Sequence, residues 1–156
     1  MDQQQYAQRV TQLRAKLYST AMLYFGQKST AQDVLDEAVY KGLCAVGRLR
    51  DPACFEAWMM RIVINECHRE SRRRKRLVHL QDAGEPSQAF YDGLPLREAV
   101  ENLPQALRDV IILRYFAGCT LAQTAQALNI PLQTAASRQK RALALLRLDF
   151  GKEDGQ

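Results

Sequence analysis

The sequence predicts an all-α protein with two small helical domains joined by a flexible linker. Apolar residues recur at helical spacing on both sides of a central stretch, and no alternating strand pattern is present. The central stretch, residues 77–95, is acidic, contains glycine, proline and serine, and has no sustained apolar period. We therefore expect one domain over residues 1–76, a second over residues 96–150, and a short tail over residues 151–156.

Three helices are expected in the first domain. The apolar stripe of the first helix consists of Val10, Leu13, Leu17, Ala21 and Tyr24. Gly26 ends this helix, and Ser29 with Gln32 predicts a capping box at the start of the second. Asp51 and Pro52 suit the N-cap and first position of a third helix.

The C-terminal end of that third helix is strongly basic. Residues 61–76 carry seven basic and two acidic side chains, so this segment alone equals the net charge of +5 of the whole chain. It ends in the run Arg72-Arg73-Arg74-Lys75-Arg76. Such a run typically binds a polyanion. The alternative is a solvated helix end that complements its own dipole.

The second domain has the layout of a helix-turn-helix. Its first long helix is expected to pack through Leu107, Val110, Ile111 and Tyr115. Thr120 with Gln123 predicts a capping box, and Asn129 tolerates a left-handed turn conformation. Pro131 suits the first turn of the next helix. The charged residues of that helix are all basic: Arg138, Lys140, Arg141 and Arg147. This layout favours a helix in the DNA major groove over a surface hairpin with a solvated basic face.

Several classes of protein do not fit the sequence. No apolar run approaches the roughly 18 residues of a membrane span, and the polar N-terminus lacks the apolar region of a signal peptide, so we expect a cytoplasmic protein. The four cysteines are scattered without a C-x-x-C pair and are expected to be small buried thiols rather than redox or zinc ligands. We expect no catalytic residues, no metal and no cofactor, because no base–nucleophile pair, metal-ligand cluster or phosphate loop is visible.

Taken in order, the motifs resemble those of bacterial RNA-polymerase sigma factors of the extracytoplasmic-function group. The segments that carry the resemblance are residues 33–43, 55–65 and 72–76 in the first domain, and residues 103–104, 112–115 and 134–142 in the second. The resemblance extends from about Leu13 to Leu148. It implies sigma domain two over residues 1–76 and sigma domain four, with its helix-turn-helix, over residues 96–150.

The resemblance also implies roles for individual residues. Asp33, Asp36 and Glu37 would bind the clamp of the RNA polymerase core. The residues that would bind promoter DNA at the minus-ten element are Arg48, Arg50, Asp51, Arg61, Asn65, Arg72, Arg73, Arg74 and Arg76. Those that would bind the minus-thirty-five element are Thr120, Gln133, Thr134, Ser137, Arg138, Lys140 and Arg141. A dedicated anti-sigma factor, which in this group is often anchored in the membrane, is the implied inhibitory partner.

Three residues of the second domain depart from the family pattern. Thr124, Ala135 and Gln139 stand where larger aliphatic residues are usual, and each is expected to weaken the core by roughly 1–3 kcal/mol. Gln139 is expected to point away from DNA, toward Leu121 and Leu128. Two alternatives to a sigma factor stay open: an operator-binding regulator that acts without polymerase, and a sigma-like protein that only occupies polymerase or an inhibitor.

Overall fold

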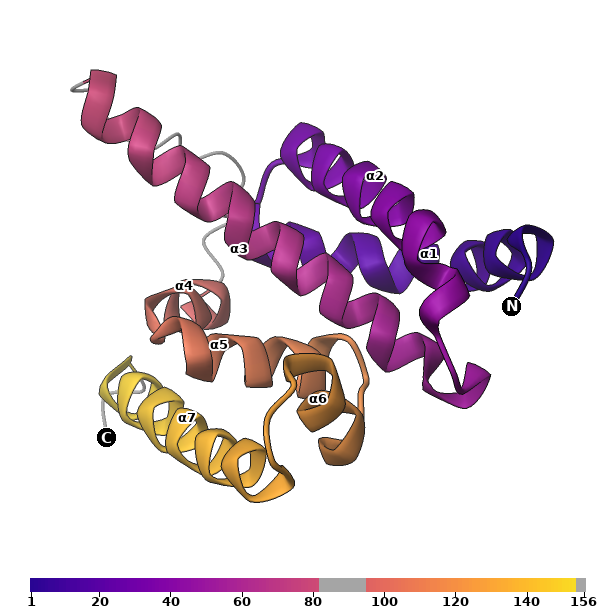
Figure 1. Ribbon diagram of the computed structural model, residues 1–156. Helices are drawn as coiled ribbons and strands as arrows, with labels where there is room; N and C mark the ends of the chain where they lie inside the picture. The colour runs from indigo at the N-terminus through magenta and orange to yellow at the C-terminus, as the bar shows by residue number, and fades with distance from the viewer. Residues whose placement is uncertain (82–94, 154–156) are drawn as a thin grey trace. The chain divides into compact units, whose positions relative to one another are not determined.

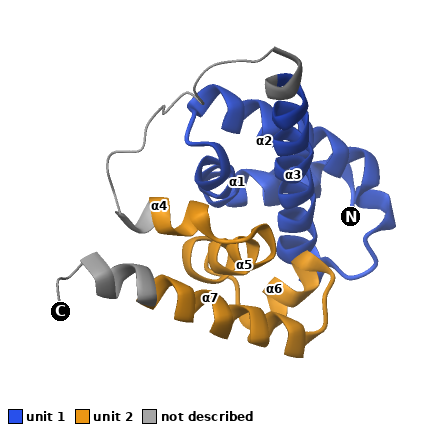
Figure 2. Ribbon diagram, turned by 90° about the vertical axis from the view of Figure 1, so that its left-hand side faces the viewer, with its two compact units in different colours: residues 1–90 blue, residues 91–156 orange. Residues whose placement is uncertain are grey.

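The protein consists of two compact helical units (Figure 2). The computed structural model describes the backbone of residues 1–81 and 95–153 and the side chains of residues 1–77 and 98–147. Unit 1 comprises residues Met1–Phe90, and unit 2 comprises Tyr91–Gln156. Within the described ranges, no helix has the length and apolar character needed to cross a membrane.

Unit 1 is a bundle of three helices that pack pairwise (Figure 1). Its elements are α1 Gln3–Phe25, α2 Lys28–Ala45, η1 Val46–Arg48, η2 Pro52–Cys54 and α3 Phe55–Gln81. Gly26 ends α1 in the left-handed conformation (φ 68°), as the sequence predicts. The predicted capping box of Ser29 and Gln32 is wrong, because α2 already begins at Lys28 and its N-cap, Gln27, makes no side-chain capping bond. Asp51 accepts a hydrogen bond from the Ala53 amide at 3.0 Å, which confirms it as the cap of the turn that leads into α3.

The core of unit 1 lies between the three helices. Its largest fully buried side chains are Leu17, Leu35, Phe55, Met59, Met60, Val63 and Ile64. The Tyr6 hydroxyl donates to the Val39 carbonyl at 2.6 Å, and the Tyr6 ring meets Phe55 edge-on with ring centroids 5.9 Å apart. Burial, reinforced by nearby Cys44, raises the pKa of Tyr6 to about 12. Tyr6 therefore stays protonated and keeps this hydrogen bond across the physiological pH range.

Helix α3 is much longer than the core that it helps to form. It has 27 residues, and among those whose side chains are described, as far as Leu77, the buried ones all lie at or before Cys67. Its last turns project past α1 and α2 (Figure 1). Residues 77–81, which the sequence assigned to the linker, continue this helix, while the linker residues 82–94 lie outside the described part of the chain. The basic run thus lies on a helix that has already left the apolar core.

Unit 2 contains α4 Pro95–Asn102, α5 Gln105–Ile111, η3 Ile112–Phe116, α6 Leu121–Leu128 and α7 Leu132–Glu153. Helix α7 packs against α4, α5 and α6. The buried apolar residues that join these helices include Val100, Leu103, Val110, Ile111, Ile112, Leu113, Ala135, Ala142 and Leu146. The helix-turn-helix is formed by α6 and α7, and Asn129 between them has a left-handed backbone (φ 57°), as predicted.

The end of the α5–η3 segment differs from the sequence expectation. Residues Ile112–Phe116 form a turn of π-helix, closed by a hydrogen bond of 2.9 Å from the Ala117 amide to the Ile112 carbonyl. The wider turn changes the angular positions of later side chains relative to a continuous α-helix. Tyr115, which was expected to pack in the core, is 51% exposed.

The close packing around Gly42 generates a stability prediction. A Cβ atom at Gly42 would overlap the Tyr6 hydroxyl and lie 3.2 Å from Met59 Sδ. Gly42→Ala is therefore expected to lower the free energy of unfolding by about 1–3 kcal/mol, as overpacked cores do. Urea unfolding of the full chain measures this change.

Gly47→Ala is the matched control, because a Cβ atom there meets nothing within 4 Å. We expect it to change the free energy of unfolding by less than about 0.5 kcal/mol. Introducing Gly42→Ala into a Tyr6→Phe background should cost less than in the parent protein, since the overlapping hydroxyl is gone. Equal effects of the two alanines would contradict the packing argument.

Candidate nucleic-acid interface

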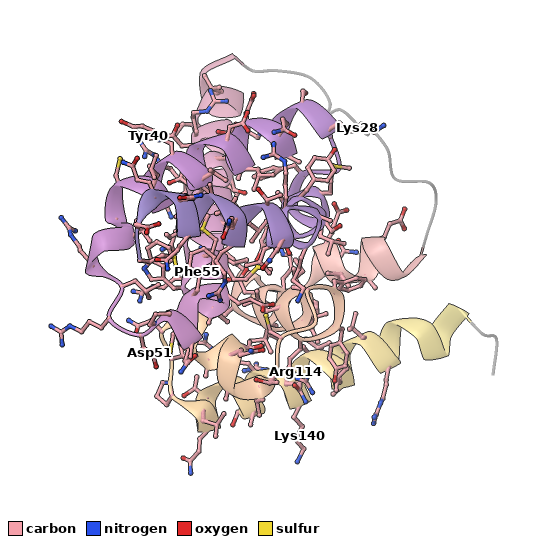
Figure 3. All side chains as sticks on the ribbon, turned by 90° about the vertical axis from the view of Figure 1, so that its right-hand side faces the viewer. Lys28, Tyr40, Asp51, Phe55, Arg114 and Lys140 are labelled. Atoms are coloured by element: carbon pink, nitrogen blue, oxygen red, sulfur yellow. The ribbon has the colours of Figure 1, made fainter. Side chains whose placement is uncertain are left out.

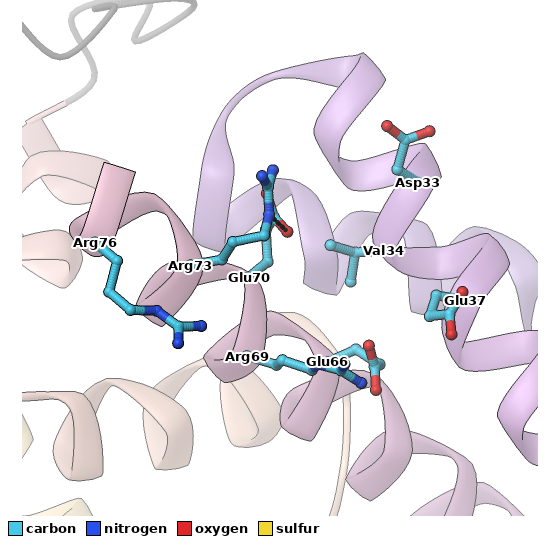
Figure 4. A pocket seen from close by; sticks show the side chains of 8 residues that line it. All are labelled: Asp33, Val34, Glu37, Glu66, Arg69, Glu70, Arg73 and Arg76. Atoms are coloured by element: carbon cyan, nitrogen blue, oxygen red, sulfur yellow. Dashed lines mark hydrogen bonds and ion pairs between the residues drawn. The ribbon is translucent and has the colours of Figure 1, made fainter. Parts of the chain in front are cut away.

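The five basic residues at the end of α3 point in different directions, because successive residues of an α-helix are rotated by about 100°. Arg73 and Arg76 line a groove of about 340 Å³ between α2 and α3 (Figure 4). Arg74 turns toward α1 and the start of α2. Arg72 and Lys75 are exposed. The five residues, which look alike in the sequence, therefore face three different environments: the groove, the α1–α2 corner and solvent.

The groove has both acidic and basic walls. Its lining residues are Asp33, Val34 and Glu37 from α2, and Glu66, Arg69, Glu70, Arg73 and Arg76 from α3 (Figure 4). Glu66 is paired with Lys41 across the two helices, and its side chain is only 11% exposed. Asp33 and Glu37 are exposed, and the structure gives them no hydrogen bond or ion pair among the described residues. Two of the three predicted polymerase-binding acids thus lie together at the groove.

Asp36, the third of these acids, has partners of its own. It accepts a hydrogen bond from Gln32 Nε2 at 2.7 Å and lies 3.9 Å from Arg14 Nη2 of α1. Its side chain is 61% exposed, so these contacts contribute little to stability. They do direct the carboxylate toward α1, whereas Asp33 and Glu37 line the groove beside α3.

Arg73 is held by an acid on its own helix. Its guanidinium donates to both oxygens of Glu70, from Nε at 3.0 Å and from Nη2 at 2.6 Å. This hydrogen-bonded pairing with Arg73 holds the pKa of the Glu70 carboxyl below its usual value. The pair is consequently intact at neutral pH and is lost only when the pH falls through that lowered pKa. A phosphate must compete with Glu70 for Arg73.

The predicted minus-ten residues farther up α3 share one exposed face. Arg61, Asn65 and Arg72 follow at spacings of four and seven residues, which place them on the same side of the helix. All three are exposed, and the structure gives none of them a hydrogen bond or ion pair with another described residue. Trp58 is only partly buried, and its ring packs against Phe55 at a centroid distance of 5.7 Å.

The loop before α3 carries the remaining predicted minus-ten residues. Arg48 and Arg50 are exposed, while the exposed Asp51 uses one carboxylate oxygen to cap η2. Arg9 of α1 holds the base of this loop: its Nη2 donates to the Pro52 carbonyl at 3.4 Å, and its guanidinium lies 4.8 Å from the Phe55 ring centroid. Arg9 was not among the predicted residues, since no local pattern links it to a loop that lies 43 residues away.

In unit 2 the start of α6 is capped as the sequence predicts. The Gln123 amide donates to Thr120 Oγ1 at 3.1 Å, and the Thr120 amide donates to Gln123 Oε1 at 2.9 Å. Thr120 remains exposed. Gln133, Ser137 and Arg141 follow at four-residue spacing on one exposed side of α7.

The other predicted minus-thirty-five residues flank this side of α7. Thr134 and Arg138 are half-buried, whereas Lys140 is exposed and extends into solvent (Figure 3). The exposed basic face of α7 is opposed by the buried Ala135 and Ala142, which pack into unit 2. The helix therefore has one packed side and one side free to meet a ligand.

The three departures from the family pattern are buried or hydrogen bonded in the structure. Thr124 and Ala135 are completely buried, and Thr124 Oγ1 donates to the Thr120 carbonyl at 2.9 Å. Gln139 accepts a hydrogen bond of 3.1 Å from Arg114 Nε, and Arg114 Nη1 donates to the Cys119 carbonyl at 2.9 Å. Gln139 thus links α7 to the π-turn through a charge-assisted hydrogen bond.

Comparison with known proteins bears on these two units. Residues 9–77 match the family described as "Sigma-70 region 2", and residues 99–148 match "Sigma-70, region 4". The chain belongs to the sigma-70 family of RNA polymerase sigma factors. Its relatives place it in the extracytoplasmic-function group.

Two relatives from Bacillus subtilis illustrate the similarity. The RNA polymerase sigma factor SigV is 27% identical over 150 residues, which cover 93% of this chain and 90% of SigV. The ECF sigma factor SigW is 26% identical over 166 residues, covering 94% of this chain and 89% of SigW. Among solved structures, the sigma factor RpoE from Bartonella quintana, crystallised with the anti-sigma factor NepR, has the same fold. Its TM-score is 0.78 at 22% identity, covering 94% of this chain and 97% of that one.

The contact between Arg114 and Gln139 predicts that a polar residue at position 139 stabilises this sigma factor more than an aliphatic residue does. Gln139→Leu adds apolar area but leaves Arg114 Nε without its acceptor. We expect it to lower the free energy of unfolding by about 1 kcal/mol, because an unsatisfied charged donor costs more than a methyl group contributes. Thermal unfolding of the full chain measures the change.

Gln139→Glu is the control, since it keeps an acceptor for Arg114 and should match the parent or exceed it. If Gln139→Leu proved more stable than the parent, the hydrogen bond would be incidental and the loss of the aliphatic residue would be the dominant effect.

Proposed function

We propose that this protein is a sigma factor that brings the RNA polymerase core to specific promoters and initiates transcription there. The observation that carries the proposal is the order of its two units: a region 2 bundle with an exposed basic helix, followed by a region 4 helix-turn-helix with a second one. Two DNA-binding surfaces on one chain suit a promoter with two separated elements. The similarity to curated RNA polymerase sigma factors over most of the chain supports the same function.

In unit 1 the minus-ten element is proposed to meet the exposed face of α3 and the loop before it. Arg61, Asn65 and Arg72 would contact the edge of the duplex, where arginine neutralises phosphates. The loop from Arg48 to Asp51 would hold an unpaired base. No covalent step is needed, because contacts to single-stranded bases offset the stacking energy lost on opening.

Polymerase is proposed to bind along the wall of the α2–α3 groove that α2 forms. Asp33 and Glu37 support this role, because they are exposed acids one helical turn apart and the structure gives them no partner among the described residues. Asp36 would have a smaller part, since its carboxylate already faces Gln32 and Arg14. Basic residues of the polymerase clamp are the matching chemistry.

In unit 2 the exposed side of α7 is proposed to read the minus-thirty-five element. Gln133 lies near the N-terminal end of α7, where recognition helices meet base edges, and Ser137 and Arg141 continue along the same side. Thr134 and Arg138 flank this side, Lys140 would contact phosphate, and Thr120 would meet the backbone at the start of α6. An anti-sigma factor is the proposed inhibitor, by analogy with the Bartonella sigma factor that was crystallised with one.

In vitro transcription with core polymerase on genomic DNA tests the function directly. Adding the protein should produce defined start sites, each preceded by a common pair of elements, whereas core polymerase alone should not. If the chain binds core polymerase yet yields no defined start site, it only occupies polymerase. Tight operator binding by a dimer in the absence of polymerase would instead identify a conventional helix-turn-helix regulator.

The two basic residues Arg141 and Lys140 should behave differently in promoter selection. Arg141→Ala is expected to cost about 1–3 kcal/mol at its preferred base and to relax the selected minus-thirty-five sequence, because arginine can grip guanine bidentately. Lys140→Ala should weaken all sequences alike and lower the salt slope of binding by about 0.9. Selection from a randomised upstream element, followed by salt titration, measures both effects. A changed sequence preference for Lys140→Ala together with an unchanged one for Arg141→Ala would mean that the assigned face of α7 is wrong.

A further inference from the structure

The last turns of α3 are attached to the rest of unit 1 by few contacts. No described residue of α3 after Cys67 is buried, although side chains are described as far as Leu77. Tyr24 and His68 meet edge-on with ring centroids 6.1 Å apart. Between Arg69 and Leu77, where side chains are described, the hydrogen bonds and ring contacts from α3 to another helix are made by Arg74.

Arg74 fits a socket at the corner between α1 and α2. Its Nη2 donates to Gln27 Oε1 at 3.2 Å and to Thr30 Oγ1, and its guanidinium lies 5.3 Å from the centroid of the Phe25 ring. On its own helix, Nε donates to Glu70 at 3.3 Å. The same side chain thus contacts the last residue of α1, the N-cap of α2 and the first turn of α2.

The socket is preorganised for a planar cation. Thr30 is 8% exposed and donates to Gln27 Oε1 at 3.1 Å, so the two acceptors are already linked to each other. The aromatic face and the two acceptors suit a guanidinium, which stacks and donates in fixed directions. A lysine has the charge but lacks the planar fork.

We propose that Arg74 is a positioning residue, which ties the end of α3 to the α1–α2 corner and thereby orients Arg72 for DNA. The inference rests on the proposed DNA-binding role of α3. Arg72 and Arg74 are separated by about 200° around the helix, so they point to opposite sides. Loss of Arg74 lets the last turns of α3 move relative to the bundle, and promoter binding must then order these turns before Arg72 can contact phosphate.

The test uses holoenzyme assembled from core polymerase and the full chain, with promoter affinity measured across a range of salt. Arg74→Ala and Thr30→Val should each lower affinity by roughly three- to tenfold, as expected when a hydrogen bond to a charged group is lost. Their salt slopes should match the parent, because no phosphate contact is removed. Arg72→Ala should instead lower the slope by about 0.9. The double variant Arg74→Ala/Thr30→Val should bind no more weakly than Arg74→Ala alone.

Two conservative variants sharpen the comparison. Thr30→Ser keeps the acceptor and should bind promoter as the parent does. Arg74→Lys keeps the charge but cannot occupy the socket, and it should behave like Arg74→Ala. If Arg74→Lys restores parental affinity while Arg74→Ala lowers the salt slope and Thr30→Val has no effect, Arg74 contacts phosphate directly and the proposal is overturned.

Amide hydrogen exchange of the free full chain supplies a readout independent of DNA. Amides near Arg74 should exchange faster in Thr30→Val than in Thr30→Ser. A purely structural role is shown if exchange and melting temperature change while the promoter affinity of the folded holoenzyme does not, and that result also overturns the proposal. Failure of the proposed function has a different signature: the parent holoenzyme then selects no promoter, whereas the exchange difference between the two Thr30 variants remains.

Discussion

The helical repeat of α3 is the constraint on which the rest of unit 1 depends. One continuous helix supplies the central wall of the apolar core through Phe55, Met59 and Val63, and its far end carries the basic run. Because each residue is rotated by about 100°, adjacent arginines cannot share a face. Arg74 points toward the α1–α2 corner and contacts it, whereas Arg73 and Arg76 point into the α2–α3 groove. The surface proposed for DNA is the third side of α3, which contacts neither the α1–α2 corner nor the groove.

In unit 2, polar contacts help to fix the position of the helix that is proposed to meet DNA. Its helix-turn-helix has small or polar residues at positions where aliphatic ones were expected, and these residues are buried or hydrogen bonded. Arg114 is central, since it joins the π-turn, the Cys119 carbonyl and Gln139 of α7. A hydrogen bond holds α7 at one angle more selectively than an aliphatic contact does, because it needs a defined geometry. The orientation of the exposed side of α7 therefore depends partly on a residue that contacts no DNA in the proposed arrangement.

The parts of the fold that could be predicted from the sequence are those with local causes. Gly26, the Thr120–Gln123 cap and the left-handed Asn129 are each decided by residues within one turn, and the structure confirms them. The start of α2 and the π-turn were not predicted, because no residue pattern within one turn of either site indicates them. The partners of Arg9 and Arg74 lie 43 and 47 residues away, so they depend on tertiary structure. Composition placed the positive charge on α3 correctly but could not say which cations were already engaged.

Because some cations of α3 are already engaged within the protein, the number of DNA contacts cannot be taken from its net charge. Residues 61–76 have a net charge of +5, which suggests a large electrostatic contribution to binding. Glu70 engages Arg73 and Arg74, while Asp33, Glu37 and Glu66 lie in the groove with Arg69 and Arg76. Five exposed cations of this segment have no intramolecular hydrogen bond or ion pair in the described part of unit 1: Arg61, Arg69, Arg72, Lys75 and Arg76. Of these, Arg69 and Arg76 line the groove that also contains the acids. Since counterion release follows the phosphates actually neutralised, the salt dependence contributed by α3 should reflect these exposed cations rather than every basic residue of the segment.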